Sequence, residues 1–264
     1  MGDIPRVLSI AGSDSGGGAG IQADLKTFAA LGVHGMTAVT SVTAQDTRRV
    51  HMASDLPLDN IRLQIKAVID DIGVDAVKTG MLSSAEIISL VARAMKRYRI
   101  DRLVVDPVMI STGGDALIQP DAVDALKIDL FPLAIVVTPN LPEAQFLTGR
   151  QVRSREQIEK AIQEIFEMGP RSVILKGGHL DDPSASTDYF FDGKTVKEFA
   201  GPRIDTANTH GSGCTFASAI AAYLAQGLEL EEAVFQAKEY VSHAIQHSFS
   251  LGRGSGPLGH FWKR

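Results

Sequence analysis

The sequence predicts an α/β protein built on a mainly parallel, doubly wound sheet flanked by helices. Short apolar runs of strand length alternate with longer stretches whose apolar residues recur at helical spacing. Most of the short runs are continuously apolar, as in parallel strands covered on both faces. Hydrophobic residues make up 44% of the 264 residues and charged residues 22%, which is typical of a globular protein and excludes a disordered or fibrous chain.

Taken in order, six strands are expected, and each lies between turn signals. They span residues 7–11, 37–42, 76–78, 103–106, 135–138 and 173–176. The helical stretches between them cover residues 21–31, 57–72, 83–99, 120–130 and 154–168, and apolar positions such as Ile61, Ile65 and Val68 define one helix face.

Helix-end signals agree with these boundaries. Ser83 with Glu86, and Ser154 with Gln157, fit the capping box of a helix start. Glycines 32, 73 and 169 stand just past helix ends, where a left-handed residue is favoured.

The last third of the chain departs from the strand–helix alternation. Residues 187–204 contain aromatic residues and an Asp192-Gly193 turn, which predict a hairpin at an antiparallel edge of the sheet. Two further helices are expected over 215–226 and 230–248. Because no linker or repeat interrupts the chain, residues 1–264 are expected to form a single domain.

Charge and cysteine content exclude several classes of function. Lys and Arg total 26 against 31 Asp and Glu, giving a net charge of −5, which disfavours nucleic acid as a partner. A single cysteine cannot form an internal disulfide. The apolar run that begins at Val7 is too short for a signal peptide or a membrane span, so a cytoplasmic protein without membrane attachment is expected.

Polar or glycine residues follow most of the expected strands. Ligands of open α/β sheets bind at the carboxyl ends of the strands, so these residues are expected to share one site. They include Gly12 to Asp14, Gln45, Gly80 with Met81, Asp106, Asn140 with Glu143, and Lys176 to His179.

A glycine-rich segment, GSDSGGGAG over residues 12–20, connects the first strand to the first helix. Its backbone N–H groups could face an anion or a flat ring. It lacks the lysine and hydroxyl pair of a P-loop, and it lacks the pattern G-x-G-x-x-G. That pattern occurs at Gly254, Gly256 and Gly259, where no helix is expected to follow, and we attribute it to chance. Another glycine-containing loop, residues 111–115, is expected to close over bound phosphates.

The segment NTHGSGCT at residues 208–215 precedes a helix and predicts an anion-binding nest. Cys214 falls in the first turn, where the helix dipole is expected to lower the pKa of the thiol. A Cys–His hydrolase using His210 or His179 is an alternative. That alternative leaves Asn140, Glu143 and Lys176 without a task, whereas phosphoryl transfer needs metal ligands, a cation and an anion nest.

Seven segments, in this order along the chain, resemble the hydroxymethylpyrimidine/phosphomethylpyrimidine kinases of thiamine biosynthesis, which are ribokinase-like. The resemblance continues to the closing GSGPLGHF. The segments are AGSDSGGGAGIQADLKT (11–27), TAQDT (43–47), KTGML (78–82), VVDPVM (104–109), TPNLPEA (138–144), KGGH (176–179) and NTHGSGCT (208–215).

The resemblance implies ATP-dependent phosphorylation of 4-amino-5-hydroxymethyl-2-methylpyrimidine and then of its monophosphate. Asp24 and Gln45 match positions that bind the aminopyrimidine edge, and Gly12, Met81 and Val108 match its ring lining. Asn140, Glu143, Lys176 and Thr209 match the ATP and phosphate region, with Asp106 and Glu143 near Mg²⁺. Gly211, Ser212, Gly213 and Cys214 match the anion hole, and Cys214 stands where many superfamily members have the catalytic base.

The implied cofactors are ATP, as phosphoryl donor, and Mg²⁺, and the implied assembly is a homodimer. Pyridoxal kinase activity is the alternative within the superfamily, and Gln45 favours the pyrimidine, because Met often stands there in pyridoxal kinases. Alternatives of another class are a non-catalytic small-molecule binder and a Rossmann-type oxidoreductase. Neither explains Asn140, Glu143 and Lys176 together with the glycine nest.

Overall fold

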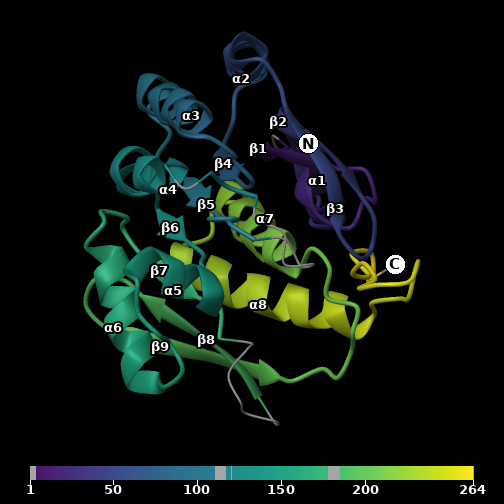
Figure 1. The fold of residues 1–264 in the computed structure, drawn as a ribbon, viewed down its shortest axis with the longest axis vertical. Coiled ribbons are helices and arrows are strands. Elements are labelled where there is room, and N and C mark those ends of the chain that lie inside the picture. Colours follow the sequence, from purple (N-terminus) through teal and green to yellow (C-terminus); the bar gives the residue numbers. More distant parts are fainter. Residues whose placement is uncertain (1–3, 111–116, 120, 178–184, 264) are drawn as a thin grey trace.

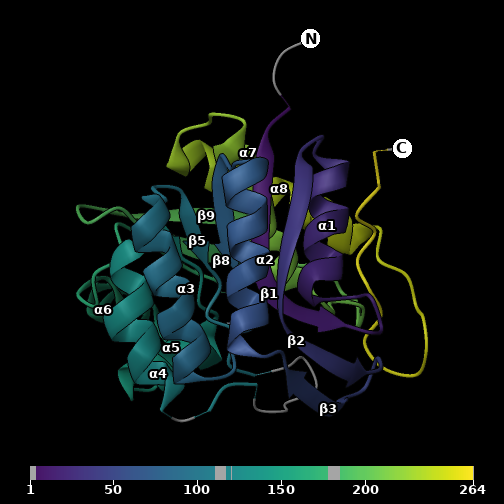
Figure 2. The same ribbon diagram turned by 90° about the horizontal axis from the view of Figure 1, so that it is seen from above.

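The computed structural model describes residues 4–110, 117–119, 121–177 and 185–263. Figure 1 shows these residues as a twisted sheet with helices on both faces, and Figure 2 shows the same arrangement from above. Two expected features, the loop at 111–115 and His179, lie outside the described residues.

The described strands form one sheet in the order β3-β2-β1-β4-β5-β6-β7-β8-β9. Strands β2, β1, β4, β5, β6 and β7 run parallel to one another, while β3, β8 and β9 are antiparallel to their neighbours. The strands are β1 Arg6–Asp14, β2 His34–Gln45, β3 Val50–Asp55, β4 Ala76–Thr79, β5 Leu103–Val105, β6 Val136–Val137, β7 Val173–Leu175, β8 Ala185–Phe191 and β9 Val196–Pro202.

Helices cover both faces of the sheet, so the doubly wound prediction is confirmed (Figures 1 and 2). Successive strand residues point to opposite faces, and Val7 accordingly packs in one core while Leu8 packs in the other. The helices are α1 Gly20–Ala30, α2 Leu58–Asp71, α3 Ala85–Tyr98, α4 Ala122–Ala125, α5 Leu141–Thr148, α6 Arg155–Phe166, α7 Ser212–Ala225 and α8 Leu230–Gln246.

Two cores separate these helices into layers. One core packs α2, α3 and α6, with shorter helical turns, against the sheet, and the other packs α1, α7 and α8. Helix α7 is buried along most of its length, which explains why its sequence is rich in alanine rather than amphipathic.

The structure corrects several expected elements. Strand β3, which pairs with the end of β2, was not predicted, because its residues are mostly exposed and include only three apolar ones. Helix α5 was not among the predicted helices. The helix expected over 120–130 is α4 followed by a π-helix, Leu126–Leu130.

The predicted capping signals have mixed outcomes. Ser84, not Ser83, caps α3 by accepting the N–H of Ile87, and the Ser83 hydroxyl is buried without a partner among the described residues. Ser154 caps α6 as predicted, although Gln157 accepts from Arg153 rather than completing the box. Glycines 32, 73 and 169 all have positive φ at helix ends, as predicted.

Candidate active site

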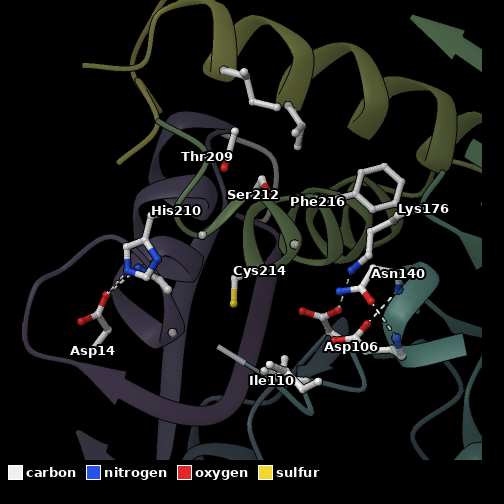
Figure 3. A pocket seen from close by; sticks show the side chains of 18 of the residues that line it. Asp14, Asp106, Ile110, Asn140, Lys176, Thr209, His210, Ser212, Cys214 and Phe216 are labelled. Atoms are coloured by element: carbon white, nitrogen blue, oxygen red, sulfur yellow. Dashed lines mark hydrogen bonds and ion pairs between the residues drawn. The ribbon is translucent and has the colours of Figure 1, made fainter. Parts of the chain in front are cut away.

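A cavity of about 660 Å³ opens at the carboxyl ends of the parallel strands, within the size range of small-molecule sites. Figure 3 shows Cys214 near its middle, between the Asp14–His210 pair on one side and Lys176 with Asp106 on the other. Of the residues that the family resemblance assigns to the site, all except Asp24 line it: Gly12, Gln45, Met81, Asp106, Val108, Asn140, Glu143, Lys176, Thr209, Gly211, Ser212, Gly213 and Cys214. Gly80 and Gly177, which the sequence also placed at this edge of the sheet, are not among the lining residues.

The ring-sized part of the cavity is formed by the ends of β1, β2 and β4. Gly12 lies against Met81, because a Cβ on Gly12 would stand 3.2 Å from the Met81 sulfur. The Gln45 Oε1 lies 3.2 Å from the Thr43 hydroxyl, which holds the amide at the wall of the cavity. This arrangement offers a flat apolar slot with an amide at its edge, which suits a polar aromatic ring.

Asp24 does not contact this slot, so the expected contact of Asp24 with a ring is wrong. Its carboxylate is fully buried and forms an ion pair with Lys78 at 3.0 Å. It also accepts from the hydroxyls of Ser9 and Ser218, at 2.5 and 2.7 Å. Its partner Lys78 is also fully buried, and it is among the residues that surround the cavity.

The glycine-rich segment binds an anion that belongs to the protein itself. Asp14 accepts the N–H groups of Gly16, Gly18 and Ala19 at 2.8 to 3.0 Å, and it contacts His210 Nε2 at 3.0 Å. Burial alone would raise the pKa of Asp14, but these hydrogen bonds outweigh it and hold the pKa below its usual value. The interpretation that these amides face a ligand anion is therefore wrong for these three N–H groups.

This pairing also changes the interpretation of His210. Its Nε2 is engaged by Asp14, and Figure 3 shows the ring turned toward that carboxylate. A Cys–His hydrolase needs the imidazole within reach of the sulfur as a base. The geometry does not favour that alternative.

Helix α7 begins at the cavity with an uncapped N-terminus. Gly211, its N-cap, has φ of 85°, and no side chain caps the first turn. A Cβ on Gly211 would lie 1.9 Å from the carbonyl oxygen of Gly18, so only glycine fits there. The N–H of Ser212 donates to the carbonyl of Thr209 at 3.1 Å. The following N–H groups of the first turn, those of Gly213 and Cys214, have no acceptor within the helix, and together with the helix dipole they form an anion-binding nest.

A cation stands beside this nest. Lys176 Nζ lies 3.0 Å from Asp106 Oδ1, and it would lie 3.2 Å from a Cβ on Gly213. Burial alone would lower the pKa of Lys176, but Asp106 and Glu143 outweigh it and raise that pKa, so the lysine is charged. The nest and the ammonium converge on one point, as the binding of a phosphoryl group requires.

Asn140 and Glu143 form a capping box at the start of α5. The Asn140 side chain accepts the N–H of Glu143, and Glu143 Oε2 accepts the N–H of Asn140, both at 2.8 Å. The pattern Asn-x-x-Glu before an apolar run is a sequence signal for this box. Glu143 is only 4% exposed although it stands in the first turn of α5.

The carboxylates at this end of the cavity fit a hydrated divalent cation. Burial, with a further contribution from Asp106, raises the pKa of Glu143 to about 7 against the opposing effect of Lys176. Asp106 Oδ1 accepts from Lys176 and Thr138, and no described residue bonds its Oδ2. No group of three or more ligating side chains was found among the described residues. Mg²⁺ is commonly bound by one or two carboxylates together with waters and substrate phosphates, so the donor set present is sufficient.

The expected low pKa of Cys214 is wrong. Burial raises the pKa of this thiol to about 11, even though Lys78 and the N–H of Gly20 act in the opposite direction. The effect of the helix N-terminus on the thiol is outweighed by desolvation, because protein atoms surround the sulfur even though the residue is partly exposed to the cavity. The thiol is therefore protonated at neutral pH.

Sequence reasoning missed the far end of the cavity. That end is formed by the hairpin and α8, where a buried ion pair joins Lys238 to Asp188 at 2.8 Å beside apolar Val241 and Ile245. No spacing in the sequence connects the hairpin with α8. Only their packing against each other brings these residues into the cavity.

Comparisons with known proteins agree with this geometry. A family profile described as phosphomethylpyrimidine kinase matches residues 14–259. The hydroxymethylpyrimidine/phosphomethylpyrimidine kinase of Rhizobium meliloti is 50% identical over 97% of this chain and 98% of its own length. The chain is 52% identical to the thiamine biosynthesis bifunctional protein ThiED of Geobacter sulfurreducens but spans only 53% of that protein's length.

Solved structures of similar proteins share the fold. The pyridoxal kinase of Bacillus subtilis, solved as an ADP complex, is 41% identical with a TM-score of 0.92, covering 98% of each chain. The phosphomethylpyrimidine kinase of Clostridium difficile is 44% identical with a TM-score of 0.81, covering 91% of this chain and 99% of its own. The expected ribokinase-like fold is confirmed.

Proposed function

The chain belongs to the phosphomethylpyrimidine kinase family, and on that premise we propose that it phosphorylates hydroxymethylpyrimidine and then its monophosphate with ATP, as a single kinase domain in thiamine biosynthesis. One observation carries this proposal: an apolar slot edged by Gln45 opens into the same cavity as Lys176 and the uncapped start of α7. A ring and a phosphoryl group can therefore lie side by side in it.

The ring half of the site binds the pyrimidine. Met81 and Gly12 contact the ring faces, and Val108 closes the slot. The Gln45 amide pairs with the donor and acceptor groups at the edge of an aminopyrimidine. The hydroxymethyl group then points toward Cys214, which lies between the Asp14–His210 pair and the Lys176–Asp106 pair (Figure 3).

The phosphate half holds the transferring group. The first-turn N–H groups of α7 and the Lys176 ammonium face the oxygens on which negative charge is distributed during transfer. The far end of the cavity, with Val241, Ile245 and the Lys238–Asp188 pair, receives the rest of the nucleotide. The ADP complex of the similar pyridoxal kinase supports a nucleotide site in this fold.

Asp106 and Glu143 would hold Mg²⁺, Asp106 through Oδ2 and Glu143 directly or through water. When bound, this ion neutralises charge on the phosphates of the nucleotide. In the first phosphorylation the thiolate form of Cys214, a small fraction of the molecules at neutral pH, accepts the proton of the substrate hydroxyl. The second substrate carries an ionised phosphate and needs no base, because the second pKa of a phosphomonoester is about 6.

A single assay tests the assignment. With Mg²⁺ and ATP, the protein should convert the hydroxymethylpyrimidine to the monophosphate and then to the diphosphate. Product analysis and the release of ADP measure the two steps. A protein that binds the pyrimidine without turnover would instead be a binder. Pyridoxal, assayed in parallel, measures the competing activity.

Pyridoxal phosphorylation is the second candidate function, and a specific observation favours it. The pyridoxal kinase of Staphylococcus aureus, in complex with pyridoxal, has a TM-score of 0.92 at 40% identity. Gln45 is the observation on the other side, since an amide suits the pyrimidine edge. The ratio of kcat/KM values for the two substrates decides between them.

Three expectations about assembly, location and partners stay predictions: a homodimer, a cytoplasmic location and no nucleic-acid partner. None of the described helices is long and apolar enough to cross a membrane. Sedimentation of the purified chain would measure the assembly state.

A further inference from the structure

The chain after α8 returns to the cavity and crosses two loops that carry site residues. We call residues 249–260 the C-terminal strap. Figure 1 shows it in yellow beside β3, and Figure 2 shows it beside β2 and β3. The strap contains none of the residues that line the cavity.

The strap first fastens the loop that follows β2. Thr47, two residues after Gln45, accepts the N–H groups of Arg253 and Gly254 on its hydroxyl at 3.2 and 3.0 Å. The carbonyl oxygen of Thr47 accepts the N–H of Ser255 at 3.0 Å. Three hydrogen bonds thus hold the end of the strand that carries Gln45.

The same stretch of strap fastens the turn that leads into α7. Ser255 Oγ accepts the N–H of Thr209 at 3.1 Å and donates to the carbonyl of Ala207 at 2.7 Å. The carbonyl of Gly256 accepts the N–H of His210 at 3.2 Å. These contacts lie immediately before Gly211, the N-cap of the anion-binding nest.

Close approach explains the glycines of the strap. A Cβ on Gly254 would lie 2.0 Å from the Thr47 carbonyl oxygen, and one on Gly256 would lie 2.3 Å from the Phe249 carbonyl oxygen. A Cβ on Gly259 would lie 2.2 Å from the carbonyl oxygen of His247. The G-x-G-x-x-G spacing that we attributed to chance thus has a structural cause unrelated to nucleotide binding.

The end of the strap is anchored beneath the nest. His260 Nε2 lies 3.0 Å from the Thr215 hydroxyl, which in turn donates to the carbonyl of Gly211 at 2.8 Å. Tyr240 donates its hydroxyl to the His260 carbonyl at 2.8 Å. The strap is therefore fixed at both of its ends and cannot shift without moving the turn at Gly211.

We propose that the strap is a positioning element that holds the Gln45 strand end and the α7 nest in a fixed relation, with Thr47 and Ser255 as its positioning residues. Ring and phosphoryl group are bound by different segments, and a misplacement of 1 Å can lower a rate by about 10²-fold. This inference rests on the proposed function for its kinetic consequence. Its structural content, the coupling of two loops by one segment, does not depend on the substrate.

The test uses paired variants of exposed or half-buried residues outside the cavity lining. Thr47→Val removes the hydroxyl acceptor but keeps the side-chain shape, and Thr47→Ser restores the acceptor. Ser255→Ala removes the acceptor of the Thr209 N–H. Thr195→Val is the control, because it removes an exposed hydroxyl at the hairpin turn, far from the strap along the sheet.

We expect kcat/KM for the hydroxymethylpyrimidine to fall by about tenfold or more in Thr47→Val and Ser255→Ala. Thr47→Ser and Thr195→Val should stay within about twofold of wild type. Thr47→Val should raise KM for the pyrimidine, since Gln45 moves, whereas Ser255→Ala should lower kcat with both substrates, since the nest moves. Rates are normalised to folded protein measured by circular dichroism.

Hydrogen exchange separates this proposal from the proposed function. Amides of residues 209–211 should exchange faster in Ser255→Ala than in wild type, whether or not any substrate is turned over. If the wild-type protein does not phosphorylate the pyrimidine but the exchange difference between wild type and Ser255→Ala is present, the proposed function is overturned and the proposal for the strap stands. Unchanged exchange, or a lowered melting temperature with kcat and KM per folded protein unchanged, would overturn the strap.

Discussion

Cys214→Ala is the most informative substitution, because the structure sets the protonation state of the residue it removes. With a pKa of about 11, the thiolate makes up only about 0.1% of the molecules at pH 8. If the thiolate is the base, log kcat for the hydroxymethylpyrimidine should rise with pH by about one unit per pH unit between 7 and 10. The sign follows from the reaction, since the deprotonated sulfur is the active form.

The size of the loss follows from the same assignment. Removing a positioned base lowers a rate by roughly 10²–10⁴-fold, so Cys214→Ala should lose that factor on the alcohol substrate. It should also lose the pH slope. The monophosphate, which is already ionised, should be phosphorylated at a rate much closer to that of wild type. Helix α7 should remain folded, because alanine is a strong helix former.

Initial rates of ADP release measured on both substrates from pH 6.5 to 10, for wild type and variant, provide the comparison. Equal losses on the two substrates, or an alcohol rate in wild type that does not change with pH, would refute the base assignment. Either result would instead mean that the sulfur shapes the nest. The kinase assignment would stand in both cases.

Two other substitutions test separate parts of the site, and a third tests the stability of the fold. Gln45→Met should shift preference from the pyrimidine toward pyridoxal by the roughly 1–3 kcal/mol of a lost buried hydrogen bond, and an unchanged ratio of kcat/KM values would show that Gln45 does not contact the ring. Glu143→Gln keeps an acceptor for the capping box but removes the negative charge of the side chain. The half-saturating Mg²⁺ concentration should therefore rise by about 10–100-fold with little change in melting temperature, and an unchanged Mg²⁺ titration would contradict this. Burial lowers the pKa of His260 to about 4, so below about pH 6.5 the unfolded chain takes up a proton that the folded protein excludes. The free energy of unfolding should therefore fall by up to about 3 kcal/mol as the pH drops from 7 to 4. His260→Gln should show a shallower fall in chemical denaturation across that range, and identical slopes would rule out this contribution.

Local pattern in the sequence was sufficient for the order of elements and the edge of the sheet that carries the site. Apolar runs such as the one at Val7 and helical spacing such as that of Ile61 and Ile65 depend only on near neighbours along the chain. The rule that ligands bind at the carboxyl ends of parallel strands then placed Asp106, Asn140 and Lys176 together, as the structure does. The resemblance to a known family supplied the expected chemistry.

Tertiary structure decided which polar groups are available to a ligand. Sequence reasoning placed Asp24 and Asp14 where a ligand would bind, yet Lys78 neutralises the first and the glycine-rich loop surrounds the second. Partners so distant along the chain leave no periodic signal, because their pairing depends on how whole elements pack.

The same reason accounts for the remaining differences. A helix N-terminus lowers a thiol pKa, but desolvation by the surrounding protein raises that of Cys214 to about 11. Strand β3 buries none of its residues, so burial leaves no pattern in its sequence, and it forms because the end of β2 offers an unpaired edge. Glycine is required at 254, 256 and 259 because each position lies too close to a backbone carbonyl oxygen for a Cβ, and this approach exists only in the folded chain. Periodicity and local composition can be read directly from the sequence, whereas burial, charge pairing and close backbone approach exist only once the chain has folded.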